Sequence, residues 1–288
     1  MSSDRGALRR IAIVTAAAAV ALFAATFGAE SAEARARFFQ FNTCGNVCND
    51  GAVASVADAI KRSILDFRPH AVGLNEVCRA QYKGVLRRLR RTGWAMRGRF
   101  VATKTRANDC PVVGGRPRFG NAVLTRNPIL WARSWPLPHR DGSASAPEIR
   151  KLLCVTTSIA GFHKRVCSTH ITNTGRRRKN AQIRKVTRIV TPWVRRGPVV
   201  VMGDFNVIPT NHALDRLYSP NHGGGASGRF QEADESAFHC RCGESTSGSR
   251  KIDYIFLSNR HWNAPSANAT HSDVSDHDPL RGSVARRR

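Results

Sequence analysis

The apolar positions of the chain fall into short runs, separated by amphipathic segments and by turns rich in Gly, Asn and Pro. Runs rich in β-branched and aromatic residues predict strands. They lie at 37–42, 71–78, 120–130, 151–161, 165–172, 197–206 and 251–259. In 51–70 and 180–194 the apolar residues recur at helical spacing, and 82–94 predicts a strongly basic helix. Alternating strands and helices favour an α/β fold.

The segment 151–171 contains two alternating strands around Ala160 and Gly161, which predicts a β-hairpin. The strands of a hairpin are antiparallel, so the sheets of this protein cannot be purely parallel. The register of the hairpin would place Cys154 opposite Cys167. We therefore expect a mixed α/β sandwich in which these two cysteines can pair.

Polar side chains end several of the predicted strands. In "VVVMGDFNVIPT" (199–210), apolar residues lead into Asp204 and Asn206, which are two positions apart and point to the same side. When these two residues are taken alone, an Asx turn is the better explanation. The same kind of ending recurs at Asn42, Glu76 and His170, and at 276–277 within "SDHDP" (275–279), where we expect the last ordered feature. If these ends converge, the resulting acidic pocket suits a hard divalent cation and a phosphate.

The N-terminus predicts a cleaved export signal. Three arginines within the first ten residues precede an apolar run over 11–29, and an A-x-A cleavage site ends at Ala34. An uncleaved membrane anchor is the alternative, because a spanning helix needs about 20 apolar residues. We expect cleavage near Ala34, which leaves 35–288 as a single domain in a secreted, extracellular protein. We expect no stable membrane association after cleavage, and a monomer is favoured.

The chain carries a formal net charge of +26. Residues 35–288 keep this charge, because 1–34 contain three basic and three acidic side chains. So large an excess favours polyanionic partners such as nucleic acid, anionic polysaccharide or an acidic membrane surface.

All eight cysteines follow the predicted leader, and an even number in an exported protein favours disulfides. A zinc site is the competing interpretation, because "FHCRCG" (238–243) brings His239, Cys240 and Cys242 together. The Cys-x-Cys spacing is not the usual spacing of zinc ligands, which counts against it.

Seven segments in order, "FNTCG", "GLNEVC", "FGNAVLTR", "CSTHITN", "MGDFN", "KIDYIFLS" and "SDHDP", resemble the motifs of the endonuclease/exonuclease/phosphatase superfamily, whose fold is that of deoxyribonuclease I. The resemblance covers nearly all of 35–288. It implies a four-layer α-β-β-α sandwich with two mixed β-sheets and an active site at one rim. The chain departs from the shared motifs at Asn75, where many relatives carry Gln, and in the cysteines beside Asn42 and Glu76.

The resemblance also implies a metal site and a histidine that contacts the substrate. Glu76 would be the main metal ligand, supported by Asn42 and Asp276, with Mg²⁺ as the ion and Mn²⁺ as a substitute. His277 would contact the scissile phosphate and act as general base, with Asp253 fixing its tautomer.

The remaining residues implied by the resemblance would act on water and on the phosphate oxygens. Asp204 would orient or deprotonate the attacking water, or serve as the acid. Asn206 and His170 would donate hydrogen bonds to the phosphate as negative charge builds up. Asn173 would be a further polar contact.

Charge decides between the substrates that this superfamily cleaves. The basic run formed by Arg176, Arg177, Arg178 and Lys179 closely follows His170, and a phosphate backbone is its natural partner. Relatives that act on membranes would show an exposed apolar hairpin, whereas aromatic residues here are sparse and lie mostly inside strand or helix patterns.

These features predict a secreted, metal-dependent nuclease, with DNA favoured over RNA. A secreted phosphodiesterase or phosphatase that acts on lipid headgroups or small phosphates is the alternative. A catalytically inactive, basic binding protein on the same fold is less favoured, because a binding module has no need of four carboxylates beside a polyanion.

Overall fold

The computed structural model describes residues 35–104, 107, 109–139, 148–159, 161–235 and 239–287. The predicted leader (1–34) therefore lies outside the described residues, as does Ala160 of the predicted hairpin turn. None of the helices within the described ranges is long and apolar enough to cross a membrane.

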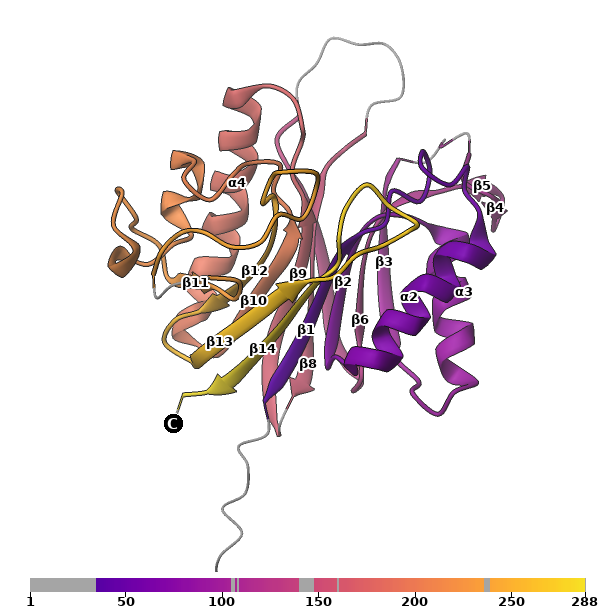
Figure 1. Cartoon of the computed structure of the whole chain (residues 1–288), viewed down its shortest axis with the longest axis horizontal. Helices are drawn as coiled ribbons and strands as arrows, with labels where there is room; N and C mark the ends of the chain where they lie inside the picture. Colours follow the sequence, from indigo (N-terminus) through magenta and orange to yellow (C-terminus); the bar gives the residue numbers. More distant parts are fainter. Residues whose placement is uncertain are drawn as a thin grey trace, which may run out of the picture. The chain divides into compact units, whose positions relative to one another are not determined.

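Two six-stranded sheets form the centre of the fold (Figure 1). The first has the strand order β13 (Trp262–Ala269), β14 (Leu280–Arg286), β1 (Ala36–Asn42), β2 (Ala71–Cys78), β6 (Phe119–Thr125) and β3 (Arg97–Lys104). The second has the order β11 (Phe230–Glu232), β12 (Asp253–Ser258), β10 (Val199–Asp204), β9 (Phe162–His170), β8 (Lys151–Ile159) and β7 (Ile129–Pro136). Both sheets are mixed, because β1 pairs with β2 and β9 with β10 in parallel whereas their other neighbours are antiparallel. A small ribbon joins β4 (Val112–Val113) and β5 (Arg116–Pro117).

Helices cover the outer face of each sheet (Figure 1). Helices α2 (Val53–Phe67) and α3 (Arg79–Arg90) pack on the first sheet. Helix α4 (Arg176–Val190) and the short helices η1 (Thr191–Arg195), η2 (His212–Arg216) and η3 (Pro220–His222) lie on the side of the second. A third apolar cluster, which includes Phe38 from the first sheet and Met202 from the second, fills the space between the sheets. The four-layer α-β-β-α sandwich is therefore confirmed.

Several predicted boundaries were wrong, two of them at prolines. The segment 120–130 is not one strand, because β6 ends at Thr125 and β7 begins at Ile129 in the other sheet. Pro128 lies in the turn between them and has no N–H to continue the ladder. The predicted helix 180–194 begins earlier, at Arg176, and its α-helical part stops at Val190, two residues before Pro192.

The end of the chain was also predicted wrongly, because "SDHDP" is not the last ordered feature. It is followed by β14, which pairs antiparallel with β1 and with β13. The sequence of β14, LRGSVAR, alternates Leu, Gly and Val with Arg and Ser, which is the pattern of a half-buried strand, and this signal was overlooked.

Four disulfides join the eight cysteines: Cys44–Cys48, Cys78–Cys110, Cys154–Cys167 and Cys240–Cys242. The predicted pair is confirmed, because Cys154 and Cys167 lie directly opposite each other in the β8–β9 hairpin. Both of these residues are fully buried beneath α4.

We expect the double variant Cys154→Ala/Cys167→Ala to lower the free energy of unfolding by about 3 kcal/mol, because the bond closes a loop whose freedom otherwise stabilises the unfolded chain. Denaturant unfolding of the oxidised proteins measures the loss. Cys44→Ala/Cys48→Ala is the control, since that bond closes a loop of only four residues' separation and should cost less. Alkylation of either Cys154 or Cys167 in the native wild-type protein would contradict the pairing.

Candidate active site

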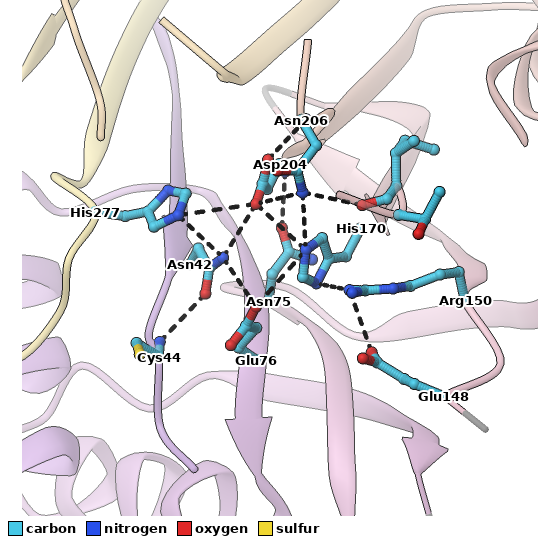
Figure 2. A network of polar contacts seen from close by, with 12 residues as sticks. Asn42, Cys44, Asn75, Glu76, Glu148, Arg150, His170, Asp204, Asn206 and His277 are labelled. Atoms are coloured by element: carbon cyan, nitrogen blue, oxygen red, sulfur yellow. Dashed lines mark hydrogen bonds and ion pairs between the residues drawn. The ribbon is translucent and has the colours of Figure 1, made fainter. Parts of the chain in front are cut away.

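The polar strand ends gather at one rim of the sandwich (Figure 2). The parallel pairing of β1 with β2 brings Asn42 beside the end of β2, and that of β9 with β10 sets His170 opposite Asp204. Parallel strands carry their carboxyl ends to the same edge, so each pair presents its last residues together. Asp253 begins the antiparallel strand β12 directly opposite Asp204.

Glu76 occupies a break in the ladder between β2 and β6. Its φ is 52°, in the left-handed region, and the register between the two strands shifts between Leu74 and Val77. This bulge turns the side chain out of the sheet, and it remains 23% exposed. Its Oε1 lies 3.5 Å from Nδ2 of Asn42 and 3.7 Å from Nε2 of His170. Glu76 is thus a partly open carboxylate at the mouth of the site.

Asp204 is the most connected carboxylate of the site. Its Oδ2 accepts hydrogen bonds of 3.1 Å from the amides of Asn42 and Asn206, and lies 3.3 Å from Nε2 of His170. Its Oδ1 accepts the backbone N–H of Asn206 at 2.8 Å. Burial alone would raise the pKa of Asp204, but the hydrogen bond and charge of His170, with His277 and the Asn206 N–H, hold it below its ordinary value. Asp204 is therefore held as an ionised acceptor.

His277 and Asp253 form a buried pair across the site. Nδ1 of the ring lies 2.7 Å from Oδ2 of Asp253, and Nε2 faces Asn42 and Asp204 at 3.5 and 3.9 Å. Burial lowers the pKa of His277, but the Asp253 carboxylate, aided by Asp204 and Asp276, outweighs burial and raises it to about 9. Asp253 thus fixes the ring so that Nε2 is the atom directed to the centre of the site.

Two further residues of the site, Arg150 and Glu148, were not predicted from the sequence. One guanidinium nitrogen of Arg150 contacts Nδ1 of His170 and lies 3.2 Å from Oε1 of Glu148, which also accepts from Oγ1 of Thr103 at 3.0 Å. Arg150 precedes β8, and the hairpin register places the start of β8 beside the end of β9. That register was the available signal, because it brings residue 150 next to His170.

Asn75 was named only as a departure from related sequences, but it lies at the base of the site. Its Oδ1 accepts the backbone N–H of Asp204 at 3.0 Å and Nε2 of Gln40 at 2.8 Å. Its Nδ2 donates to Asn121 and Ser168 at 3.1 and 3.2 Å. Asn75 therefore links the first sheet to the strand that carries Asp204.

Two residues of the predicted site stand apart from this network. Asp276 is exposed; its Oδ1 lies 3.6 Å from Sγ of Cys48, and no contact joins it to Glu76 or Asn42 among the described residues. Asn173 is exposed in the loop between β9 and α4. The basic run after it forms the first turn of α4, where Nζ of Lys179 donates to the backbone oxygen of Asn206 at 2.8 Å.

The donor set of the rim fits a hard cation. Glu76 offers an accessible carboxylate and Asn42 an amide, and the side chains around them supply oxygen rather than sulfur, because Cys44 and Cys48 are bonded to each other. Oxygen donors with room for several waters match the preference of Mg²⁺ or Mn²⁺.

The sequence matches a family model, the Endonuclease/Exonuclease/phosphatase family, over residues 39–277. No curated protein matches the sequence significantly.

Several solved structures share the fold. The human Nocturnin catalytic domain with bound sulfate has a TM-score of 0.68 and 19% identity, covering 88% of this chain and 95% of that one. Mannosyl-6-phosphatase from Bacteroides thetaiotaomicron has a TM-score of 0.61 and 14% identity, covering 87% and 99%. D. rerio TDP2 complexed with a single-strand DNA product has a TM-score of 0.61 and 13% identity, covering 87% and 99%.

Identities this low show a common fold and nothing of the substrate. The family match is more informative, because it runs from the first strand, at Phe39, to the histidine of the rim, His277. The chain therefore belongs to the Endonuclease/Exonuclease/phosphatase family.

Proposed function

We propose that the protein is a secreted, metal-dependent nuclease that hydrolyses phosphodiester bonds of nucleic acid, with DNA favoured over RNA. Members of the family are hydrolases that act on phosphoester bonds. The choice of substrate rests on one observation, the cationic first turn of α4 next to the catalytic rim.

The first turn of α4 places positively charged side chains at the N-terminus of the helix, which is itself partly positive. Arg176, Arg177, Arg178 and Lys179 begin the helix, and no acidic residue lies in this turn. The N-terminus of a helix has a partial positive charge, which repels cationic side chains there and stabilises a bound anion. The bond from Lys179 to the Asn206 carbonyl fixes this end of α4 beside the site. The arrangement supports a substrate whose negative charge extends beyond the reacting phosphate.

A cavity beside this turn offers room for such an extension. It has a volume of about 480 Å³ and is lined by Pro138, His139, Gly175, Arg177, Arg178 and Ala181. A phosphate chain that leaves the rim would enter it between α4 and the end of β7. D. rerio TDP2 holds a single-strand DNA product on the same fold, which is consistent with nucleic acid as a substrate.

Glu76 and Asn42 would hold the metal ion, with Asp276 moving in from its loop. A divalent cation there neutralises phosphate charge and polarises a phosphoryl oxygen. Glu76 has a side chain open enough to meet it, whereas Asp204 and Asp253 are buried in contacts with other residues.

The other residues of the rim would move a proton and stabilise charge. Asp204 accepts hydrogen bonds from two side-chain amides. We propose that it orients and deprotonates the attacking water. Nε2 of His277 would bind a phosphate oxygen, with Asp253 fixing the ring. Asn206 and His170 would stabilise the oxygens that gain charge. Arg150 acts as a positioning residue, since it holds Nδ1 of His170.

The metal ligands can be tested by substitution at Glu76 and Asp276. We expect chelator to abolish phosphodiester hydrolysis and Mg²⁺ or Mn²⁺ to restore it. Glu76→Gln and Asp276→Asn should each raise the metal concentration needed for half-maximal rate, because each removes an anionic oxygen ligand. Asp273→Asn is the matched control, since Asp273 is 92% exposed three residues before Asp276. Full activity in excess chelator would rule out the metal mechanism.

We expect His277→Ala and Asp204→Asn each to lower kcat about 10²-fold or more, as is usual when a proton-transfer or charge-stabilising group is removed. His212→Ala is the control, because this histidine has an 84% exposed side chain and pairs only with Asp215 among the described residues. Steady-state kinetics on a small phosphodiester, with circular dichroism to check the fold, gives the comparison. A folded variant with wild-type kcat would remove that residue from the mechanism.

The nuclease assignment predicts a salt-dependent affinity for duplex DNA. In a Glu76→Gln background, the log–log slope of affinity against salt should be about −0.9 for each phosphate that the protein neutralises. Changing Arg176, Arg177 and Arg178 to Ala should flatten this slope and leave cleavage of a small phosphodiester nearly unchanged. Changing the exposed Arg87, Arg90 and Arg91 of the α3 end to Ala removes equal charge as the control. Far faster hydrolysis of sphingomyelin or a small phosphate monoester than of DNA or RNA would favour the alternative function.

A further inference from the structure

A second cationic region lies at the opposite end of the second sheet. Strands β9 and β10 pair in parallel from Arg165 and Val199 at one end to His170 and Asp204 at the other. Five strand residues at about 3.3 Å each separate the two ends by about 17 Å. A group bound at the Arg165 end therefore cannot touch the catalytic rim.

Two cavities flank the short helix η1 at this end. The larger, of about 690 Å³, is lined by Arg195, Arg196, Arg229 and Arg260 together with Thr191, Pro192, Val194 and Asn259. The smaller, of about 210 Å³, shares Arg196 and adds Arg165 and Trp193. No acidic residue lines either cavity, and none of these arginines makes an ion pair with a carboxylate within the described ranges.

Uncompensated guanidinium groups so close together repel one another. Burial, and then the charge of Arg196, lowers the pKa of Arg165, which shows that the repulsion reaches the smaller cavity. Arginine binds phosphate through a planar fork of donors, so an anion that carries several phosphates would relieve this repulsion.

An aromatic surface continues the cationic one. The rings of Trp131, Trp135 and Trp193 contact one another, with centroid distances of 5.7, 6.0 and 6.2 Å. The guanidinium carbon of Arg165 lies 4.4 Å from the ring centroid of Trp193, and that of Arg133 lies 5.2 Å from the ring centroid of Trp135. Trp131 remains 38% exposed on the edge strand β7. Strand β7 has no neighbour on its outer side, which leaves part of this aromatic surface open to solvent.

We propose that this belt, defined by Trp131, Arg165, Trp193, Arg195, Arg196, Arg229 and Arg260, binds single-stranded nucleic acid apart from the catalytic centre. Adjacent aromatic and cationic surfaces are how proteins hold a single strand, since bases stack on the rings while phosphates follow the cations. A duplex keeps its base faces covered and could use only the arginines. The belt goes beyond the proposed nuclease function, because binding there requires no cleavage.

The experiment measures how tightly fluorescent oligothymidylate binds to protein that carries Glu76→Gln, in the presence of chelator. The oligomer is about 16 nucleotides long, which is the upper end of the size of a single-stranded binding site. The belt variant carries Arg195→Gln, Arg196→Gln, Arg229→Gln and Arg260→Gln. We expect about tenfold weaker binding at moderate salt, and a salt slope that is flatter by about 0.7 for each phosphate that the variant no longer neutralises. The matched control carries Lys83→Gln, Arg87→Gln, Arg90→Gln and Arg91→Gln, which removes the same charge from the exposed face of α3 and should change binding little.

Trp131→Ala tests the stacking. It should weaken binding of oligothymidylate about fivefold, as removal of one stacking ring usually does, and leave binding of an abasic oligomer of equal charge unchanged. Equal losses for the belt variant and its control would overturn the proposal. The proposal would also be overturned if binding of duplex DNA or of anionic lipid vesicles depended on the belt as strongly as binding of single strands does. Equal weakening of binding of the two oligomers by Trp131→Ala would overturn it too.

The test separates this inference from the proposed nuclease function. The belt substitutions, placed in the otherwise wild-type protein, should leave hydrolysis of a small phosphodiester unchanged, which also shows that the variant folds. If wild type binds single strands through the belt and cleaves no nucleic acid, the inference stands and the nuclease function fails. If wild type cleaves DNA and the belt variant binds like the control, the inference fails and the nuclease function stands.

Discussion

One buried amide, that of Asn75, fixes how the two sheets meet at the rim that carries Glu76 and Asp204. Its oxygen accepts two hydrogen bonds and its nitrogen donates two, to partners on both sheets, so its polar capacity is fully used. A satisfied polar network in the interior specifies a single packing, because any slip leaves buried groups unpaired. Glu76, the proposed metal ligand, follows Asn75 directly, and the backbone N–H of Asp204 donates to the oxygen of Asn75. The relative position of the two carboxylates therefore depends on this one side chain.

Strained backbone and shared hydrogen-bond acceptors hold the other residues of the rim in place around Asn75. Glu76 and Asn206 both have positive φ, an uncommon conformation that packing must hold in place. Their side chains face the same space as His170 and His277 (Figure 2). Strand ends thus carry the candidate site, and in the proposed function the charge of the surrounding helices selects the substrate.

The parts of the structure that follow local rules could be predicted from sequence. The strand ends at Asn42, His170 and Asp204 lie together as expected, because apolar runs and polar ends mark carboxyl edges of strands. The role of Asn75 could not be predicted, since it depends on which strands become neighbours across the two sheets. The position of Arg150 beside His170 followed from the predicted β8–β9 hairpin but was overlooked. Edge strands such as β7 and β13 were also not predicted as separate strands, because one open side relaxes the apolar pattern that burial imposes. The proline-containing turn at 127–128 was present in the sequence and was misread.

That turn has a consequence for how the domain can assemble. Only residues 126–128 separate β6, inside the first sheet, from β7, at the edge of the second. So short a crossing ties the two sheets together covalently in the middle of the chain, so neither can reach its final strand order while the other is far away. The sandwich should behave as one cooperative folding unit, and exchange of one sheet between relatives by recombination would have to preserve this crossing.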